Sequence, residues 1–318
     1  MKKNIASLKL QFFILIAFFL FPSCIHRKQI DKQKLIIKTA PQIPQHHSFS
    51  AAPPITIWVH GTLMFRKPSY HLIFGDTSSL VPVISLPKDN RFQILANSIA
   101  EHDAQQFPLE EFYIFSWSGR LPNQERKSAA NKLYQEINAL CELYRKKYGC
   151  EPTIRIITHS HGGNVALNMA KIKTNAPPFS IKSLVLLACP VQEKTKHLMV
   201  NPMFQRVYSL YSSLDMIQVI APQIKRNCTT HCLNEKHKRH YRIPPFSSRL
   251  FPTYSHLTQA KIKINDFPIS HTRFSTPEFA ALLPTILEKL DSWHAQSLAG
   301  NTIAKYKLLC IYKPKKHC

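Results

Sequence analysis

The feature that most restricts the fold of this chain is a change of hydrophobic period around residue 160. An apolar, β-branched run from Thr153 to Ile157 is followed by the small-x-Ser-x-Gly sequence Thr158–Gly162, and an amphipathic helical pattern begins at once. The chain has only seven glycines, and three of them lie in this segment or in His60-Gly61. Glycine tolerates left-handed backbone angles and close approach of two chain segments. The pattern therefore predicts a tight strand–turn–helix unit with Ser160 at its apex.

Such a turn can serve as a nucleophile elbow, in which a serine hydroxyl projects from the top of a sheet. Thr158 stands where this motif most often has glycine, and threonine is still a small residue. The alternative is an ordinary helix N-cap, a position in which serine is common. The motif alone does not decide between the two interpretations.

A second strand pattern supports the elbow. The run 55–59 is β-branched and ends in His60-Gly61-Thr62, about a hundred residues before Ser160. A serine nucleophile of this kind needs two backbone N–H groups that stabilise an oxyanion, one after an earlier strand and one on the residue after the serine. Thr62 or Leu63 and His161 are the candidates. The alternative for His60-Gly61 is an ordinary turn at a strand end.

A candidate acid and a candidate base follow further along the chain. Residues 206–212 read as a strand and Asp215 lies just after it, whereas residues 261–265 alternate like a strand and precede His271. A histidine in this position would transfer the serine proton, and a carboxylate would orient its imidazole. Asp266 is the rival acid, but its place on the same short loop as His271 favours a role in a turn.

The remaining periodicity alternates between strands and helices. Such alternation predicts an α/β domain with a doubly wound, mostly parallel sheet. A continuous apolar run at 183–188 is typical of a strand that is buried on both faces. Further elements are expected at 92–102 (helix), 112–117 (strand), 124–148 (helix), 162–173 (helix) and 277–294 (helix).

Together these segments resemble the α/β-hydrolase superfamily, and most closely its bacterial lipase- and esterase-like members. The resemblance spans roughly residues 50–295 and is carried by residues 58–62, 115–119, 158–164, 211–215 and 269–271. It implies an α/β-hydrolase fold and a serine hydrolase that cleaves carboxylic esters or thioesters through Ser160, His271 and Asp215, with neither metal nor organic cofactor. It implies no particular substrate, and folds of this kind also occur in proteins without catalysis. The second hypothesis is accordingly a catalytically silent protein that binds anionic membranes.

The N-terminus has the pattern of a targeting segment. Lysines precede an apolar run at 12–21 that is short for a membrane span, so residues 1–23 are expected to be a signal peptide or a lipoprotein signal. Cys24 is the candidate lipidation site, and export without a lipid or an uncleaved anchor are the alternatives. Residues 24–50 are polar, basic and proline-bearing, as in a tether. The mature domain, residues 51–298, is thus expected in the cell envelope or outside the cell.

The balance of charge is strongly basic. Forty-two Lys and Arg against eighteen Asp and Glu give a formal net charge of +24. A charge of this sign attracts anionic surfaces such as phospholipid headgroups. The basic residues are scattered and no nucleic-acid-binding motif is present, so a nucleic-acid partner is not expected. An anionic membrane and a lipid ester are the expected partner and substrate, although a lysine-rich composition alone is an alternative explanation.

An insertion is expected between the acid and base strands, at 221–250. It carries seven Lys and Arg and a single acid, Glu235, and we interpret it as a basic cap over the catalytic face. Its Cys228, His231, Cys232, His237 and His240 are zinc-ligand types, but their spacing matches no common zinc finger. A Cys228–Cys232 disulfide or solvated loop residues are favoured, and no metal site is assigned. Residues 299–318 are expected to form a basic C-terminal tail.

Two smaller features complete the sequence predictions. Cys189 follows the buried strand pattern at 183–188 and is expected to be a core thiol. Trp117-Ser118-Gly119 ends a strand and is favoured as a packed aromatic with a turn over a wall of an acyl pocket. The sequence makes no prediction of acyl chain length, leaving group or oligomeric state.

Overall fold

The computed structural model of the protein describes residues 52–62, 78–173, 179–221, 223, 246–298 and 306–312. All of these residues belong to one compact unit. The expected signal (1–23), Cys24 and the tether (24–50) lie outside the described residues. So do Leu63 and most of the 221–250 insertion, including Cys228, Cys232 and the histidines between and after them.

A nine-stranded sheet forms the centre of the fold, in the order β2-β3-β1-β4-β5-β6-β7-β8, and β9 also pairs with β7. Six neighbouring pairs are parallel (β1 with β3 and β4, β4 with β5, β5 with β6, β6 with β7, and β7 with β9). Among the strands of the described residues, β2–β3 and β7–β8 are the antiparallel pairs. The strands are β1 Ile55–Val59, β2 Ser79–Pro82, β3 Phe112–Ser116, β4 Ile154–His159, β5 Ile181–Leu187, β6 Val207–Tyr211, β7 Leu257–Ile264, β8 Phe267–Pro268 and β9 Lys307–Ile311.

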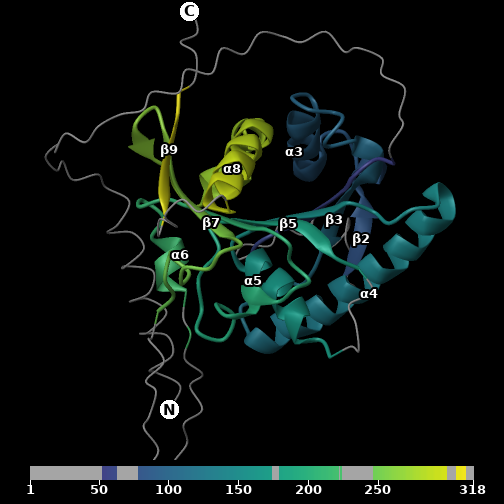
Figure 1. Cartoon of the computed structure of the whole chain (residues 1–318), viewed down its shortest axis with the longest axis horizontal. Coiled ribbons are helices and arrows are strands. Elements are labelled where there is room, and N and C mark those ends of the chain that lie inside the picture. The colour runs from purple at the N-terminus through teal and green to yellow at the C-terminus, as the bar shows by residue number, and fades with distance from the viewer. Residues whose placement is uncertain are drawn as a thin grey trace, which may run out of the picture. The chain divides into compact units, whose positions relative to one another are not determined.

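Helices cover both faces of this sheet. In Figure 1, α3 and α8 lie on one face and α4 and α5 on the other. The α-helices are α3 Arg91–Ala100, α4 Asn123–Tyr148, α5 His161–Asn168, α6 Ile217–Ile220, α7 Pro277–Ala280 and α8 Leu283–Leu298. The prediction of a doubly wound, mostly parallel α/β sheet is therefore confirmed.

Two hydrophobic cores, one on each side of the sheet, explain why the central strands are apolar throughout. Successive side chains of a strand point to opposite faces. On β4, Ile156 packs into the core under α4 and α5, and its neighbour Ile157 packs into the core under α3 and α8. On β5, Leu184 and Val185 divide in the same way. A strand buried on both faces has no polar face, which is why residues 183–188 read as a continuous apolar run.

The long helix α4 shows how local sequence sets an element's limits. Its buried residues recur at helical spacing, from Ala129 through Leu133 and Ile137 to Tyr144. The helix ends at Gly149, whose left-handed φ of 69° is the usual termination that glycine permits. Three basic residues occupy the last turn, where they interact favourably with the helix dipole.

The ends of some elements differ from the sequence predictions. The helix expected at 277–294 is divided into α7 and α8, and the helix expected at 162–173 continues after α5 only as a 3₁₀ turn, Met169–Lys171. Strand β7 begins at Leu257, four residues before the alternating pattern. These shifts arise because tertiary packing, which local periodicity does not record, decides where an element ends.

The C-terminal region also corrects an expectation, since residues 299–318 are not simply a tail. Residues Lys307–Ile311 form β9, which pairs in parallel with β7. Leu309 and Ile311 are 4% and 3% exposed and pack into the core beside α8. A five-residue strand flanked by lysines is too short for its alternation to be recognised from sequence. Within the described residues, no helix is both long and apolar enough to cross a membrane.

The buried side chains of β9 give a stability test. We expect Leu309→Ala to lower the free energy of unfolding by about 2–4 kcal/mol, the usual cost of a cavity in a core. Leu308, 49% exposed on the same strand, is the matched control. Leu308→Ala is expected to change the free energy of unfolding by less than about 0.5 kcal/mol. Chemical denaturation measures both, and equal small effects would show that β9 does not contribute to the fold.

Candidate active site

Ser160 occupies the turn between β4 and α5 in a backbone conformation that few residues adopt. Its φ is 54° and its ψ is −130°. A positive φ is uncommon for residues other than glycine and costs on the order of 1–3 kcal/mol. Two hydrogen bonds hold the turn: the Ser160 N–H donates to Leu187 O (2.8 Å) and the Gly163 N–H donates to Ser160 O (3.1 Å). A strained serine at a strand-to-helix turn is the geometry that a nucleophile elbow requires.

The glycines around this turn are needed for close packing. A Cβ atom on Gly162 would lie 2.4 Å from Val59 O and 2.6 Å from His60 O. One on Gly61 would lie 2.8 Å from the Ser160 Cβ. The start of α5 therefore rests directly on the end of β1, with no room for a side chain between them. This contact brings the His60-Gly61-Thr62 segment beside Ser160.

Thr158, the departure from the usual glycine, fits its position. It is fully buried, and its hydroxyl donates a hydrogen bond to Val185 O (3.0 Å) on the neighbouring strand. The buried hydroxyl is thus satisfied within the sheet.

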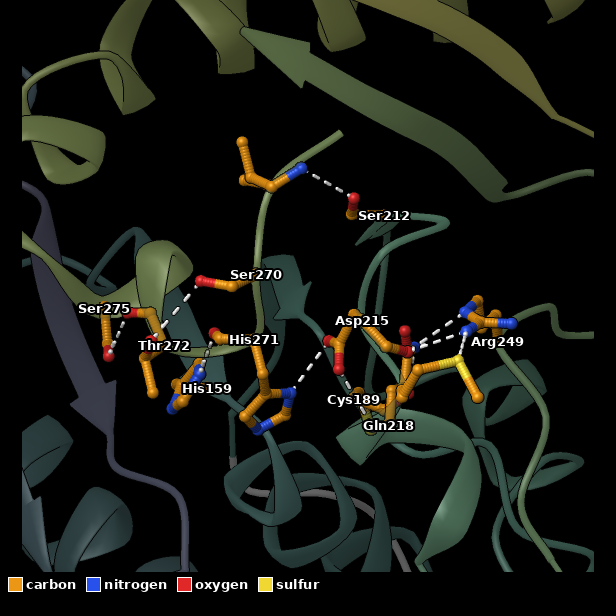
Figure 2. A network of polar contacts seen from close by, with 12 residues as sticks. His159, Cys189, Ser212, Asp215, Gln218, Arg249, Ser270, His271, Thr272 and Ser275 are labelled. Atoms are coloured by element: carbon orange, nitrogen blue, oxygen red, sulfur yellow. Dashed lines mark hydrogen bonds and ion pairs between the residues drawn. The ribbon is translucent and has the colours of Figure 1, made fainter. Parts of the chain in front are cut away.

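Asp215 and His271 are brought together from sites 56 residues apart. His271 Nδ1 lies 2.7 Å from Asp215 Oδ2, and Asp215 is fully buried (Figure 2). The other carboxylate oxygen accepts the Gln218 backbone N–H (2.9 Å). Because an ionised carboxylate only accepts hydrogen bonds, His271 carries its proton on Nδ1, and Nε2 is left as an acceptor in the neutral ring. This is the arrangement in which an acid orients a general base.

Further contacts connect the loops that carry the acid and the base. Ser212 Oγ accepts the Ile269 N–H (2.9 Å), which ties the two loops together close to both residues. Arg249 donates two hydrogen bonds to the Asp215 carbonyl oxygen, at 3.1 and 2.9 Å (Figure 2). Gln218 donates to Cys189 O (2.7 Å) and so anchors the acid loop to the end of β5. Sequence reasoning did not identify Gln218 or Arg249 as site residues, because neither belongs to a local motif.

Asp266, the rival acid, has a different place. Asn265 and Asp266 have φ of 50° and 67° and form the two-residue turn between β7 and β8. Such left-handed pairs are typical of tight hairpins. The Asp266 carboxylate accepts a hydrogen bond from Tyr312 Oη (2.7 Å). Its role in a turn agrees with the sequence interpretation, and the carboxylate bonded to His271 is that of Asp215.

His159, the residue before Ser160, connects the elbow to His271. Its Nε2 lies 3.1 Å from the His271 carbonyl oxygen, and the two ring centroids are 4.8 Å apart. Since a carbonyl only accepts, Nε2 is the protonated nitrogen. Within the described residues no hydrogen bond joins the Ser160 hydroxyl to His271. Hydrogen bonds between a nucleophile and its base are often formed only when substrate is bound.

Two of the candidate oxyanion residues, Thr62 and His161, lie close to Ser160. Thr62 follows Gly61, which packs on Ser160, and His161 begins α5. His60 supports the first of these: its Nδ1 is 2.8 Å from Gly61 O, and the Trp117 N–H donates to its Nε2 (3.2 Å). Because Nε2 accepts the Trp117 N–H, the proton of the neutral His60 ring is on Nδ1. Nδ1 then donates to Gly61 O, and this hydrogen bond orients the Gly61–Thr62 peptide. Leu63, the other candidate, lies outside the described residues.

Trp117 is a packed aromatic, as the sequence favoured. It is 5% exposed, it stacks on the His60 ring, and its indole N–H donates to His60 O (2.8 Å). Cys189 is likewise a fully buried thiol, and burial raises its pKa to about 12. A thiol with this pKa stays protonated and unreactive at neutral pH. Among the described residues no group of three or more His, Cys, Asp or Glu side chains is placed to hold a metal ion.

Comparisons with known proteins add little to this geometry. No protein-family model matches the chain, and no curated protein matches it. One solved structure to which the chain is similar is described as the crystal structure of esterase PE8, with a TM-score of 0.31 and 14% sequence identity. That match covers 52% of this chain and 72% of the esterase chain. A similarity this distant carries no argument, so the interpretation of the site rests on its own geometry.

The partly buried His159 gives a prediction of pH dependence. Burial, and then the nearby His271, lower the pKa of His159 from 6.5 to about 3. Between these values the unfolded chain binds a proton that the folded protein does not, so stability falls as the pH falls. We expect His159→Gln, which keeps an N–H donor, to reduce the slope of unfolding free energy against pH by about one proton in this range. Denaturation at a series of pH values measures the slope for each protein. Identical slopes would contradict a lowered pKa of His159 in the folded protein.

Proposed function

We propose that the protein is a serine hydrolase with an α/β-hydrolase fold that cleaves carboxylic esters through Ser160, His271 and Asp215. The observation that carries the proposal is the buried Asp215–His271 hydrogen bond of 2.7 Å. It is connected to the strained turn of Ser160 by the hydrogen bond from His159 to the His271 carbonyl oxygen (3.1 Å). The order Ser, Asp, His along the chain is the order that this superfamily uses. The mostly parallel sheet, with the serine after one central strand and the acid after another, supports the same fold.

In the proposed mechanism, Ser160 Oγ attacks the acyl carbonyl carbon while His271 Nε2 accepts the hydroxyl proton. The tetrahedral intermediate collapses as His271 returns this proton to the leaving alcohol, and an acyl-enzyme remains. Water then attacks the acyl carbon of the acyl-enzyme while His271 Nε2 accepts its proton. The second tetrahedral intermediate collapses to release the carboxylic acid, and His271 returns the proton to Ser160 Oγ. Asp215 holds the imidazole in the required tautomer and stabilises its cationic form.

The backbone N–H groups of His161 and of Thr62 or Leu63 are the proposed oxyanion donors. Donors of this kind act because they are already oriented when negative charge develops on the carbonyl oxygen. The contacts of His60 with Gly61 O and Trp117 supply that orientation for the Thr62 peptide. The start of α5 contributes the positive end of its helix dipole at the same place.

The substrate and the site of action are proposed from sequence. A lipid ester at an anionic membrane agrees with the net charge of +24, and the N-terminal pattern agrees with export and with lipidation at Cys24. A catalytically silent protein that binds such membranes is the alternative from another class. We propose no metal or organic cofactor, because the three-residue mechanism is complete without one.

The first test is hydrolysis of p-nitrophenyl esters from short to long acyl chains by the wild type and by Ser160→Ala. We expect activity in the wild type that falls by more than about a thousandfold in the variant, because the nucleophile is lost. A serine-reactive phosphonate should label the wild type at Ser160 only. A folded wild type that neither hydrolyses any ester nor reacts with the phosphonate would favour the silent membrane-binding protein.

The identity of the acid has its own test. Asp215→Asn should keep the hydrogen-bond geometry but stabilise the wrong imidazole tautomer, and a loss of about 10⁴ in kcat is expected by analogy with other triads. Asp266→Asn, five residues from His271, is the matched control and should retain nearly full activity. Equal losses in both variants, with both proteins folded, would remove Asp215 from the mechanism.

A further inference from the structure

A cavity lies away from the candidate active site, between α4 and the end of α5. Its volume is about 360 Å³, which is within the range of small-molecule sites. Four lining residues are exposed on one face of α4, and the other two lie at the end of α5 and in the 3₁₀ turn that follows. The lining residues are Gln124, Lys127, Ser128, Asn131, Asn168 and Lys171. None of them is acidic or apolar, so we name this cavity the basic groove.

Positive charge is concentrated at the basic groove. The Lys171 ammonium group donates a hydrogen bond to the Lys194 carbonyl oxygen (3.1 Å), and so lies beside a third lysine. Partial burial, and then the charges of Lys127 and Lys194, lower the pKa of Lys171. The neighbouring Glu193 pairs with Lys196 instead (2.8 Å). An anion in the basic groove would relieve the repulsion among these ammonium groups.

One residue that lines the basic groove, Asn168, has an unpaired buried acceptor. Asn168 is 2% exposed, and its amide N–H₂ donates to Asn164 O (2.7 Å), which fixes the orientation of the side chain. Its Oδ1 is buried and has no hydrogen-bond partner among the described residues. Leaving a buried acceptor unpaired is costly, so a ligand that offers a hydroxyl donor would be favoured here. The Asn168 acceptor therefore favours a hydrogen-bond donor on the ligand, whereas the lysine ammonium groups favour an anionic group.

The basic groove is separate from the candidate catalytic residues. Asn168 is eight residues after Ser160 along α5, a displacement of about 12 Å at 1.5 Å per residue. A ligand in the basic groove would thus be bound whether or not Ser160 is catalytic.

We propose that the basic groove binds a phosphate ester that carries a free hydroxyl group. Lys127 and Lys171 contact the phosphate, and Asn168 Oδ1 accepts the hydroxyl. A glycerol phosphate is a ligand of this chemistry and of suitable size. It occurs both as a free solute and as the headgroup of phosphatidylglycerol, and the basic surface of the protein would attract either.

The test is calorimetric titration of the full-length protein with glycerol phosphate. Lys127→Gln combined with Lys171→Gln should weaken binding about tenfold, the effect expected for two partly exposed charges. Lys146→Gln with Lys182→Gln removes the same charge from exposed positions outside the basic groove and should leave the affinity unchanged. Ser160→Ala should also bind as the wild type does. No binding to the wild type, or equal weakening in both double variants, would overturn the proposal.

The role of Asn168 is tested with methyl phosphate, which has the phosphate but no free hydroxyl. We expect the wild type to bind glycerol phosphate more tightly than methyl phosphate, and Asn168→Ala to bind the two equally. Thermal unfolding of the variant shows whether it remains folded. Equal affinities in the wild type would overturn the proposed hydroxyl contact.

The source of the ligand is tested by flotation with phosphatidylcholine vesicles, with and without phosphatidylglycerol. A lipid headgroup would be supported by binding that requires phosphatidylglycerol. This binding should be lost in the Lys127→Gln, Lys171→Gln variant and kept in the Lys146→Gln, Lys182→Gln variant. Binding of soluble glycerol phosphate without binding to these vesicles would support a free solute. Vesicle binding that is equal in both double variants would overturn a headgroup in the basic groove.

Discussion

The close contact between the end of β1 and the start of α5 is the constraint on which the candidate site depends. Because Gly162 rests on Val59 O and His60 O, the serine turn and the loop after β1 have a fixed spacing. Ser160 has its positive φ in this turn, and the same packing places the Gly61–Thr62 peptide beside it. The parallel sheet makes the contact possible, since both segments leave adjacent strands at the same edge. A side chain at Gly61 or Gly162 would push the loop after β1 away from the serine turn.

The environment of Asp215 explains how a buried carboxylate is tolerated. A charge without water needs hydrogen bonds from its surroundings. His271 and the Gln218 backbone supply one to each oxygen. The loop itself is held by Arg249 at the Asp215 carbonyl and by Ser212, which joins it to the loop of His271. The acid and the base are therefore positioned as a unit.

The two polar regions of the molecule differ in kind, which supports separate roles for them. The candidate active site is buried and combines one carboxylate with imidazoles, which suits proton transfer. The basic groove is largely exposed and combines ammonium groups with neutral amides and a hydroxyl, which suits binding of an anion without chemistry. The proposed ester hydrolase and the proposed phosphate-ester site are consequently independent hypotheses.

The sequence by itself determined the local parts of this protein. The change of period at Ser160, the apolar strands and the long stripe of α4 are recorded in neighbouring residues, so the α/β sheet and the strand–turn–helix unit were predictable. Only the tertiary structure decided which carboxylate meets His271, that β9 joins β7, and that Gln218, Arg249 and His60 support the site. It also decided that Lys127 and Lys171 share a groove. These contacts join residues far apart in the chain, and packing, which no local pattern encodes, brings them together.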